Sequence, residues 1–216
     1  MKRLSFVSLF ILVLFMNQSI SQVVDEKANT ILDKVSAKMK SFISMKIEFT
    51  YTIDNKAEKI HQCKTGVVTI KGDKYSLVIQ KQRIISDGKT VWTYIPDANE
   101  VQVNNVNTKD DEALNPAKLL ATYSKNYRAK LVKEVNQGGV MTQIIDLVPI
   151  KGKAFFKVRL MIDKTKLQVL STEIYNKNGS TYTYKVNKFT PNSKVLDTEF
   201  SFKASDFPGV EINDMR

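Results

Sequence analysis

Few residues of this chain could carry out chemistry. Its only histidine, His61, and its only cysteine, Cys63, are two positions apart. Side chains two apart on a strand lie on the same face, and a histidine can activate a thiol, but such a site also needs a third group that orients the histidine. A zinc site needs three or four protein ligands, and this pair supplies two. We therefore expect no metal and no enzymatic activity, and we keep a secreted hydrolase that uses His61 and Cys63 as an alternative.

Two other motifs have explanations that involve no catalysis. Ser86-Asp87-Gly88 contains a possible nucleophile, but Asp-Gly is a strong signal for a hairpin turn. The run Asp110-Asp111-Glu112 is predicted to be a solvated loop that places negative charge at a helix N-terminus. The sequence contains no GxGxxG, phosphate-binding loop or HExxH motif, so we expect no nucleotide or other cofactor. A single cysteine cannot form an intramolecular disulfide, and Cys63 is predicted to be a half-buried structural thiol.

The first residues indicate export. Met1-Lys2-Arg3 is basic, Leu4–Met16 is an apolar run, and Ser19-Ile20-Ser21 places small residues where signal peptidase cuts. We predict a signal peptide over residues 1–21 and a mature domain over 22–216, which begins at Gln22. The alternative is a membrane anchor, but the apolar run is shorter than the ~20 residues that span a bilayer. No cysteine lies near the predicted cut, so the mature chain should carry no lipid anchor and should be soluble.

The charge balance is basic, with 33 Lys and Arg against 22 Asp and Glu. Loss of residues 1–21 would leave a net charge of about +9. The basic residues are scattered, and an exported chain rarely meets nucleic acid, so no nucleic acid partner is expected. Attraction to anionic head groups or to an acidic protein is one use of this charge, and solubility alone is the other.

Two helices are predicted to lie among strands. Residues 24–40 have one apolar stripe, with acidic residues in the first turn and lysines near the end. That stripe consists of Ala28, Ile31, Leu32, Val35 and Met39. A second, shorter helix should begin at Pro116, with Asn115 as its N-cap, and it carries Leu119 and Leu120.

The rest of the chain alternates with a period of two. Tight turns join most of these segments, which favours an antiparallel sheet of about nine to eleven strands. The predicted strands are 47–53, 65–71, 75–80, 83–86, 91–95, 101–103, 131–134, 140–148, 154–162, 167–175 and 181–189.

Several of these segments resemble the LolA family of periplasmic lipoprotein carriers. The sharpest match is Ser86–Trp92, SDGKTVW, together with Tyr94 in the same hairpin. The strand that begins with a glycine, Gly66–Lys71, is similar to a family strand. So are Met45–Phe49 after the first helix, and the tail with Phe200-Ser201-Phe202 followed by Pro208-Gly209-Val210.

The resemblance implies an incomplete antiparallel β-barrel whose open mouth is covered by the two helices as a lid. It implies a monomeric, cofactor-free carrier of lipoprotein acyl chains, loaded by an inner-membrane ABC-type release complex and unloaded to an outer-membrane acceptor. The alternative on the same fold is a binder or sensor of another amphiphile, such as a glycolipid binder or a lipoprotein-sensing regulator. The predicted cavity residues are Phe49, Tyr51, Val68, Ile70, Tyr75, Leu77, Trp92 and Tyr94, and the predicted lid residues are Ile31, Leu32, Val35, Leu119 and Leu120.

One position departs from the family pattern. Studied members carry an arginine directly after the lysine that ends the glycine-started strand, and this arginine holds the lid shut. Here Lys71 is followed by Gly72, and Asp73 stands where proline is usual. We expect the closing contact to be absent or to be supplied by Arg83 or another basic residue.

Overall fold

The computed structural model describes residues 25–106 and 116–216. The first helix, α1, spans Glu26–Lys40, and Asp25 is its N-cap, because the Asp25 carboxylate accepts a hydrogen bond of 2.9 Å from the Ala28 N–H. The second helix, α2, spans Pro116–Asn126. Both predicted helices are confirmed. The predicted signal peptide, the cut before Gln22, the acidic run at 110–112 and the cap at Asn115 lie outside the described residues.

Twelve strands form one open sheet in the order β12-β6-β5-β4-β3-β2-β1-β11-β10-β9-β8-β7. All neighbours pair antiparallel except β12 and β6, which are parallel. The strands are β1 Met45–Asn55, β2 Ile60–Lys71, β3 Lys74–Ile79, β4 Gln82–Ser86, β5 Thr90–Ile95, β6 Glu100–Asn105, β7 Tyr127–Gln137, β8 Val140–Pro149, β9 Phe155–Asp163, β10 Gln168–Asn176, β11 Thr181–Pro191 and β12 Glu211–Asp214. The predicted open antiparallel barrel with helices is confirmed, and the unpredicted twelfth strand is the tail, β12.

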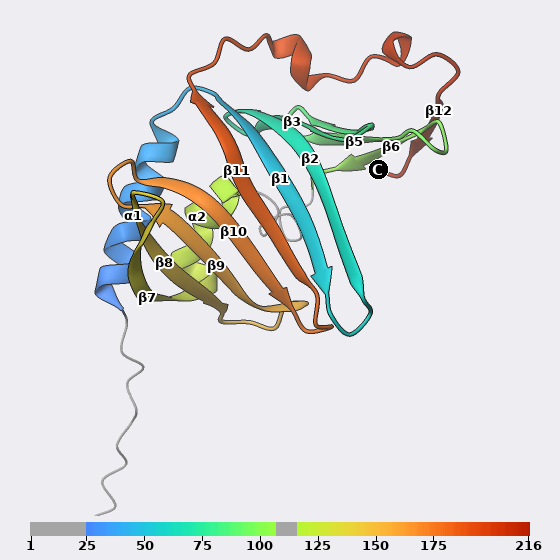
Figure 1. The fold of residues 1–216 in the computed structure, drawn as a ribbon. Helices are drawn as coiled ribbons and strands as arrows, with labels where there is room; N and C mark the ends of the chain where they lie inside the picture. The colour runs from blue at the N-terminus through green and yellow to red at the C-terminus, as the bar shows by residue number, and fades with distance from the viewer. Residues whose placement is uncertain (1–24, 107–115) are drawn as a thin grey trace, which may run out of the picture.

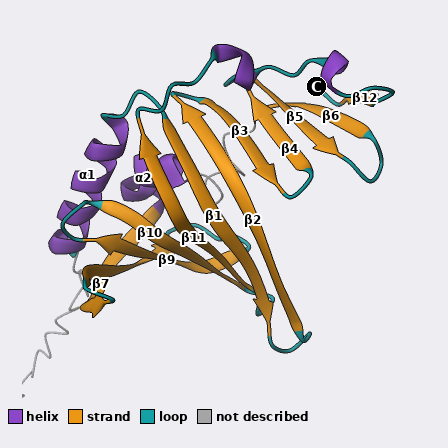
Figure 2. Ribbon diagram, turned by 45° about the horizontal axis from the view of Figure 1, so that its top comes forward, coloured by secondary structure: helices purple, strands orange, loops and turns teal. Residues whose placement is uncertain are grey.

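The sheet curls around the two helices (Figure 1). The long strands β1, β2 and β11 run through its middle, with β7–β10 on one side and the shorter β3–β6 on the other (Figure 2). We call the side on which α1 and α2 pack the inner face, and the opposite side the outer face. Among the described residues, no helix has the length and apolar character needed to cross a membrane.

The helices cover only one half of the inner face. Their apolar stripe packs on β7–β10, where Leu160 and Ile145 are completely buried. This cluster contains Ala28, Ile31, Leu32, Val35, Leu119, Leu120, Tyr123, Tyr127, Ile145, Leu147, Phe155, Val158, Leu160, Ile162, Val169 and Ile174. We call β7–β10 the covered half and β1–β5 the open half. All five predicted lid residues belong to the cluster.

The C-terminal segment packs on the opposite side of the sheet from the helices. It contains two short 3-10 helices, η1 Asp197–Phe200 and η2 Ala204–Asp206. Phe200 is 1% exposed, and the Phe207 ring lies 4.6 Å from that of Tyr94, which is on the outer face. The expected family-like strand at Phe200–Phe202 is therefore wrong: the chain forms η1 there and pairs with the sheet only at β12, after Gly209.

The signature hairpin forms the turn that was predicted for it. The Asp87 carboxylate accepts hydrogen bonds of 2.8 Å from the N–H groups of Lys89 and Thr90, and the Ser86 hydroxyl accepts one from Gly88. Gly88 has φ +93°, a conformation that favours glycine. The SDGKT motif is thus a self-bonded turn between β4 and β5, which accounts for these residue types without catalysis.

Candidate functional site

The open half of the inner face is the candidate site, because it combines apolar side chains with incomplete burial. Strand register places six of the eight predicted cavity residues on this face. The strand pairs Ile47–Val68 and Val68–Leu77 place Val68 and Leu77 on the same face as Phe49, which follows Ile47 by two residues on β1. The same face carries Tyr51, Ile70 and Tyr75. Phe49 and Ile70 are buried, whereas Tyr51, Val68, Tyr75 and Leu77 are half-buried.

Trp92 and Tyr94 do not share this face. Trp92 pairs with Ile85 and Tyr94 with Arg83, while the inner residue Ile84 pairs with Thr93. Both aromatic side chains therefore lie on the outer face, where Tyr94 packs against Phe207 of the C-terminal segment, and their predicted place in the cavity is wrong. Arg83 lies on that outer face too, so it is not positioned to replace the family arginine at the lid.

A glycine allows an aromatic ring to lie on the inner face. Gly66 pairs with Phe49, and a Cβ at Gly66 would come within 2.6 Å of the Phe49 ring and 2.9 Å of the Val78 carbonyl oxygen. Contacts this short do not occur between real side chains, so only glycine fits beneath the ring. The glycine that starts the matched strand segment thus has a packing role.

A tyrosine cluster, which sequence reasoning missed, extends the open half across β11. The Tyr51 ring lies 4.8 Å from that of Tyr184 and 6.1 Å from that of Tyr182. Burial raises the pKa of the Tyr184 hydroxyl, and its Tyr51 neighbour raises it further, so the Tyr184 hydroxyl stays neutral at physiological pH. The alternation of tyrosines at 182 and 184 was visible in the sequence, but their pairing with Tyr51 required the register of β1 and β11.

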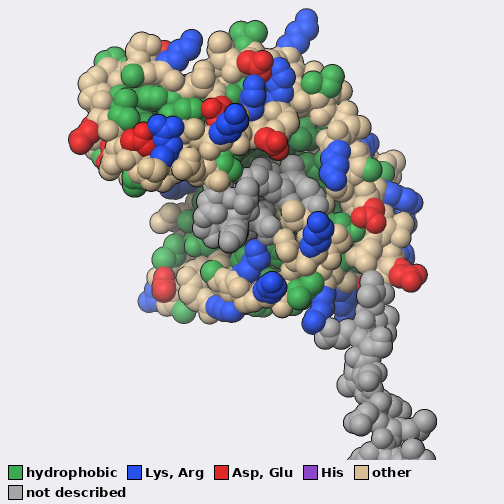
Figure 3. All heavy atoms as spheres, turned by 180° about the vertical axis from the view of Figure 1, so that it is seen from behind, with side chains coloured by type: hydrophobic (Ala, Val, Ile, Leu, Met, Phe, Trp, Pro, Cys, Tyr) green, Lys and Arg blue, Asp and Glu red, His purple; other side chains and the backbone are tan. Residues whose placement is uncertain are grey.

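A pocket of about 300 Å³ opens where the open half meets the helices. Its apolar wall combines α1 and the following loop with the inner face and α2. Met39, Phe42, Met45, Ile70, Tyr75 and Leu120 supply that wall, and Lys40, Gly72, Asp73 and Lys74 lie at its polar side. The volume is at the lower end of the ligand-pocket range, about 300–1,000 Å³. Figure 3 views the molecule from behind, opposite to Figure 1, and shows hydrophobic side chains with Lys and Arg side chains spread among them.

Gly72 lies in the β2–β3 turn with φ +58°. A Cβ there would meet nothing within 4 Å, but the left-handed conformation would strain any residue other than glycine. The flanking lysines instead bind the C-terminal segment, since Lys71 Nζ lies 3.1 Å and Lys74 Nζ 3.4 Å from Asp197 Oδ1. The position of the family arginine is therefore a left-handed turn in this chain.

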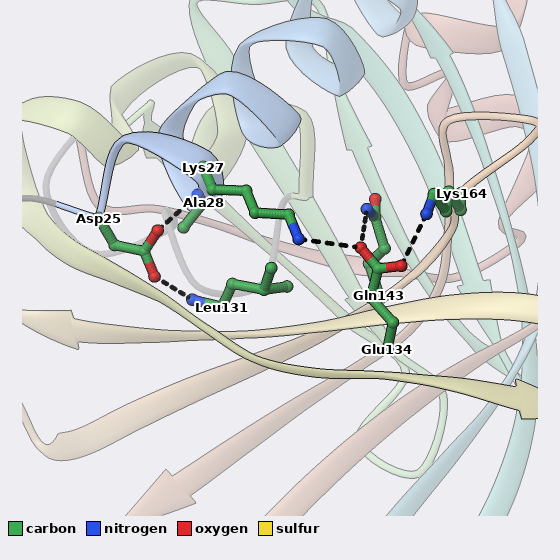
Figure 4. Close-up of polar contacts among 7 residues, drawn as sticks. All are labelled: Asp25, Lys27, Ala28, Leu131, Glu134, Gln143 and Lys164. Atoms are coloured by element: carbon green, nitrogen blue, oxygen red, sulfur yellow. Dashed lines mark hydrogen bonds and ion pairs between the residues drawn. The ribbon is translucent and has the colours of Figure 1, made fainter.

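Polar contacts attach α1 to the covered half (Figure 4). The second oxygen of the Asp25 carboxylate accepts a bond of 2.8 Å from the Leu131 N–H on β7. Glu134, also on β7, accepts bonds from Lys164 at 2.7 Å and Gln143 at 3.0 Å, and it lies 3.6 Å from Lys27 of α1. These contacts hold the N-terminal end of the helix against the sheet.

The charged groups in this attachment favour the ionised carboxylates. Hydrogen bonds from the backbone N–H groups of Ala28 and Leu131 lower the pKa of Asp25. Hydrogen bonds from Lys164 and Gln143 lower the pKa of Glu134 to about 2. The two helices are also joined, because the Tyr123 hydroxyl on α2 donates to Asp33 Oδ1 of α1 at 2.6 Å.

The predicted histidine–cysteine pair lies elsewhere. Strand pairing places His61 and Cys63 on the outer face of β2, and both are exposed, so the expectation of a half-buried Cys63 is wrong. His61 Nδ1 lies 2.6 Å from Asp54 Oδ1, and no hydrogen bond joins His61 to Cys63 in the described part of the chain. The structure describes no group of three or more His, Cys, Asp or Glu side chains that could hold a metal.

A family model described as the outer membrane lipoprotein carrier protein LolA matches residues 40–203. A search of curated protein sequences finds no match. An uncharacterized conserved protein from Thermus thermophilus has a similar structure, with a TM-score of 0.56 and 14% identity over 87% of this chain and 99% of that one. A LolA superfamily protein from Nitrosomonas europaea gives a TM-score of 0.46 and 13% identity, over 81% of this chain and 97% of that one. A putative outer membrane lipoprotein-sorting protein domain from Vibrio parahaemolyticus gives a TM-score of 0.49 and 11% identity, over 82% of this chain and 97% of that one.

Proposed function

We propose that this chain, which belongs to the LolA family of outer membrane lipoprotein carrier proteins, is a soluble periplasmic carrier of lipoprotein acyl chains. The observation that supports this proposal most directly is the half-buried apolar surface of the open half beside a pocket of about 300 Å³. Side chains such as Val68 and Leu77 face the same side as the buried core but are left partly accessible.

The energetics of acyl chains favour such a surface. Transfer of one CH₂ group out of water is worth ~0.8 kcal/mol, so a chain of about 15 methylenes gains roughly 12 kcal/mol in an apolar site. A carrier must provide a comparable surface and still release the chain. An open half that is apolar but only partly buried can accept the chain without displacing the core of the covered half.

The proposed partners follow from this role. The carrier would take its cargo from an inner-membrane ABC-type release complex and pass it to an outer-membrane acceptor, with no enzymatic step and no cofactor. The predicted signal peptide and the family membership support a location in the periplasm.

The test is binding of a fluorescent fatty-acyl probe, with lipopeptide as competitor. Replacing Leu77 with Glu should weaken binding at least tenfold, because a charge in an apolar site is costly to desolvate. Val78→Glu is the matched control, since Val78 is the next residue of β3, lies on the outer face and is 38% exposed. Equal probe affinity of the folded Leu77→Glu and Val78→Glu variants would contradict the proposal.

A second candidate, a binder of another amphiphile such as a glycolipid, is favoured by a polar row beside the apolar one. On β5 and β6 the inner face carries Thr93, Gln102 and Asn104, all half-buried. Hydroxyl and amide groups in that position could bind a neutral polar head group while the chain lies on β1–β3. Stronger competition by glycolipid than by lipopeptide in the same assay would select this candidate.

A further inference from the structure

Three loops meet at one end of the long strands, and two of them line the pocket. The three loops are residues 39–46, which comprise the end of α1, the loop after it and the start of β1, residues 71–74 at the β2–β3 turn, and residues 192–199 after β11. We call them together the rim. The Ile43 N–H donates to the Asn192 side chain at 2.9 Å, and the Asn192 N–H donates to the Ser44 carbonyl at 2.7 Å. With Lys71 and Lys74 both bound to Asp197, these contacts join the three loops into one surface, at the upper end of the sheet in Figure 1.

The rim carries the two most exposed large aliphatic side chains of the described residues. Ile43 is 75% exposed and Leu196 is 72% exposed, whereas Ile212, the next aliphatic side chain in this order, is 51% exposed. Ile43 also lines the pocket, together with its neighbour Phe42. Two isolated aliphatic tips beside a pocket opening do not form the contiguous apolar patch that a protein interface needs.

The charge of the rim is mainly positive. It holds five lysines against three acidic residues, and one of those acids, Asp197, is shared by two lysines. The lysines are Lys40, Lys46, Lys71, Lys74 and Lys194, and the acids are Asp73, Asp197 and Glu199. Lysine side chains on long flexible stems beside aliphatic tips suit a surface of anionic lipid head groups, where the tips enter the apolar region and the ammonium groups stay among the head groups.

We propose that the rim docks the protein directly on an anionic lipid bilayer, with Ile43 and Leu196 inserted and the pocket mouth facing the membrane. Such docking would bring the pocket opening to the bilayer surface, where an acyl chain could pass between the two. Its purpose rests on the proposed carrier function, but docking itself does not, since it is measured without cargo. An acidic protein partner at the same rim is the competing outcome.

The experiment is co-flotation of the exported, processed chain with vesicles, after the mass of its N-terminus has been determined. The wild type should float with vesicles of phosphatidylethanolamine and phosphatidylglycerol, float less with phosphatidylcholine alone, and dissociate as salt is raised. Burial of each aliphatic side chain is worth roughly tenfold or more in partitioning, so Ile43→Ser with Leu196→Ser should lower binding roughly a hundredfold.

The matched control is Ile150→Ser with Met141→Ser, which removes two exposed apolar side chains that lie away from the rim, at the two ends of β8. This control should bind vesicles as the wild type does. The proposal would be overturned by any of three results: an equal loss of vesicle binding in the control and the rim variant, full vesicle binding by the rim variant, or no flotation of the wild type. Probe binding measured without vesicles separates a failure of docking from a failure of the carrier function.

Discussion

The two halves of the inner face differ in burial although one continuous sheet forms both. Leu160 in the covered half is completely buried beneath the helices, whereas Leu77 in the open half is half-buried. Both are leucines on the same face, and both belong to strands with a period of two. The helices therefore complete the burial of the covered half, whereas parts of the open half stay accessible to a ligand.

The largest expected effect is on the covered half. Leu160→Ala removes fully buried methylene groups and should lower the free energy of unfolding by about 2–5 kcal/mol. Leu77→Ala should cost about 1 kcal/mol or less, because less of that side chain is removed from water. Denaturant unfolding of both variants provides the measurement. Equal losses would mean that the open half is as tightly packed as the covered half.

The second effect concerns the attachment of α1. Asp25→Ala removes the N-cap and leaves the Leu131 N–H without its acceptor, which should cost about 1–3 kcal/mol. Hydrogen exchange at the Ala28 and Leu131 amides should accelerate, while the amide of Leu77 in the open half should keep its rate. The conservative Asp25→Asn variant retains an acceptor and should lose less. Unchanged exchange at Leu131 would show that the attachment does not depend on this carboxylate.

A third, smaller effect compares two turn glycines. Gly72 has φ +58° at the pocket, and Gly138 has φ +57° in the β7–β8 turn of the covered half, and neither would crowd a Cβ. Arginine at either position should cost about 1–2 kcal/mol of strain, seen as lower melting temperatures. Only Gly72→Arg should also alter affinity for the acyl probe. An unchanged melt and unchanged probe affinity in Gly72→Arg would exclude this turn from any part in gating.

The smallest expected effect is on how the folding stability changes at acidic pH. The folded-state pKa of Glu134 is about 2, below its ordinary value of 4.5, so the folded state binds fewer protons than the unfolded state in this interval. Its stabilisation is complete above pH 4.5 and is lost as the pH falls toward 2. Glu134→Gln should therefore flatten the decline of stability over this range. If stability plotted against pH runs parallel for Glu134→Gln and the wild type, the Lys27–Glu134–Lys164 contacts add nothing to stability.

Local residue patterns were enough to predict most of the elements and to propose side chains for the candidate site. The apolar stripe of α1 predicts a helix that packs on one face, and period-two alternation with Asp-Gly and other tight turns predicts an antiparallel sheet. Both are properties of neighbouring residues, so they can be read locally. The same patterns, with the family resemblance, placed Phe49, Val68 and Leu77 correctly on one face.

The face that each strand turns inward became clear only in the folded sheet. Alternation along β5 separates Trp92 from Thr93, but it does not say which of them looks toward the helices, because a register change of one residue exchanges the two faces. The pairing of Ile84 with Thr93 settled this against Trp92 and Tyr94. The pairing of Tyr51 with Tyr184, and the contact of Lys71 with Asp197, likewise join residues more than a hundred positions apart. Such contacts depend on how the whole sheet curls, and no local pattern encodes them.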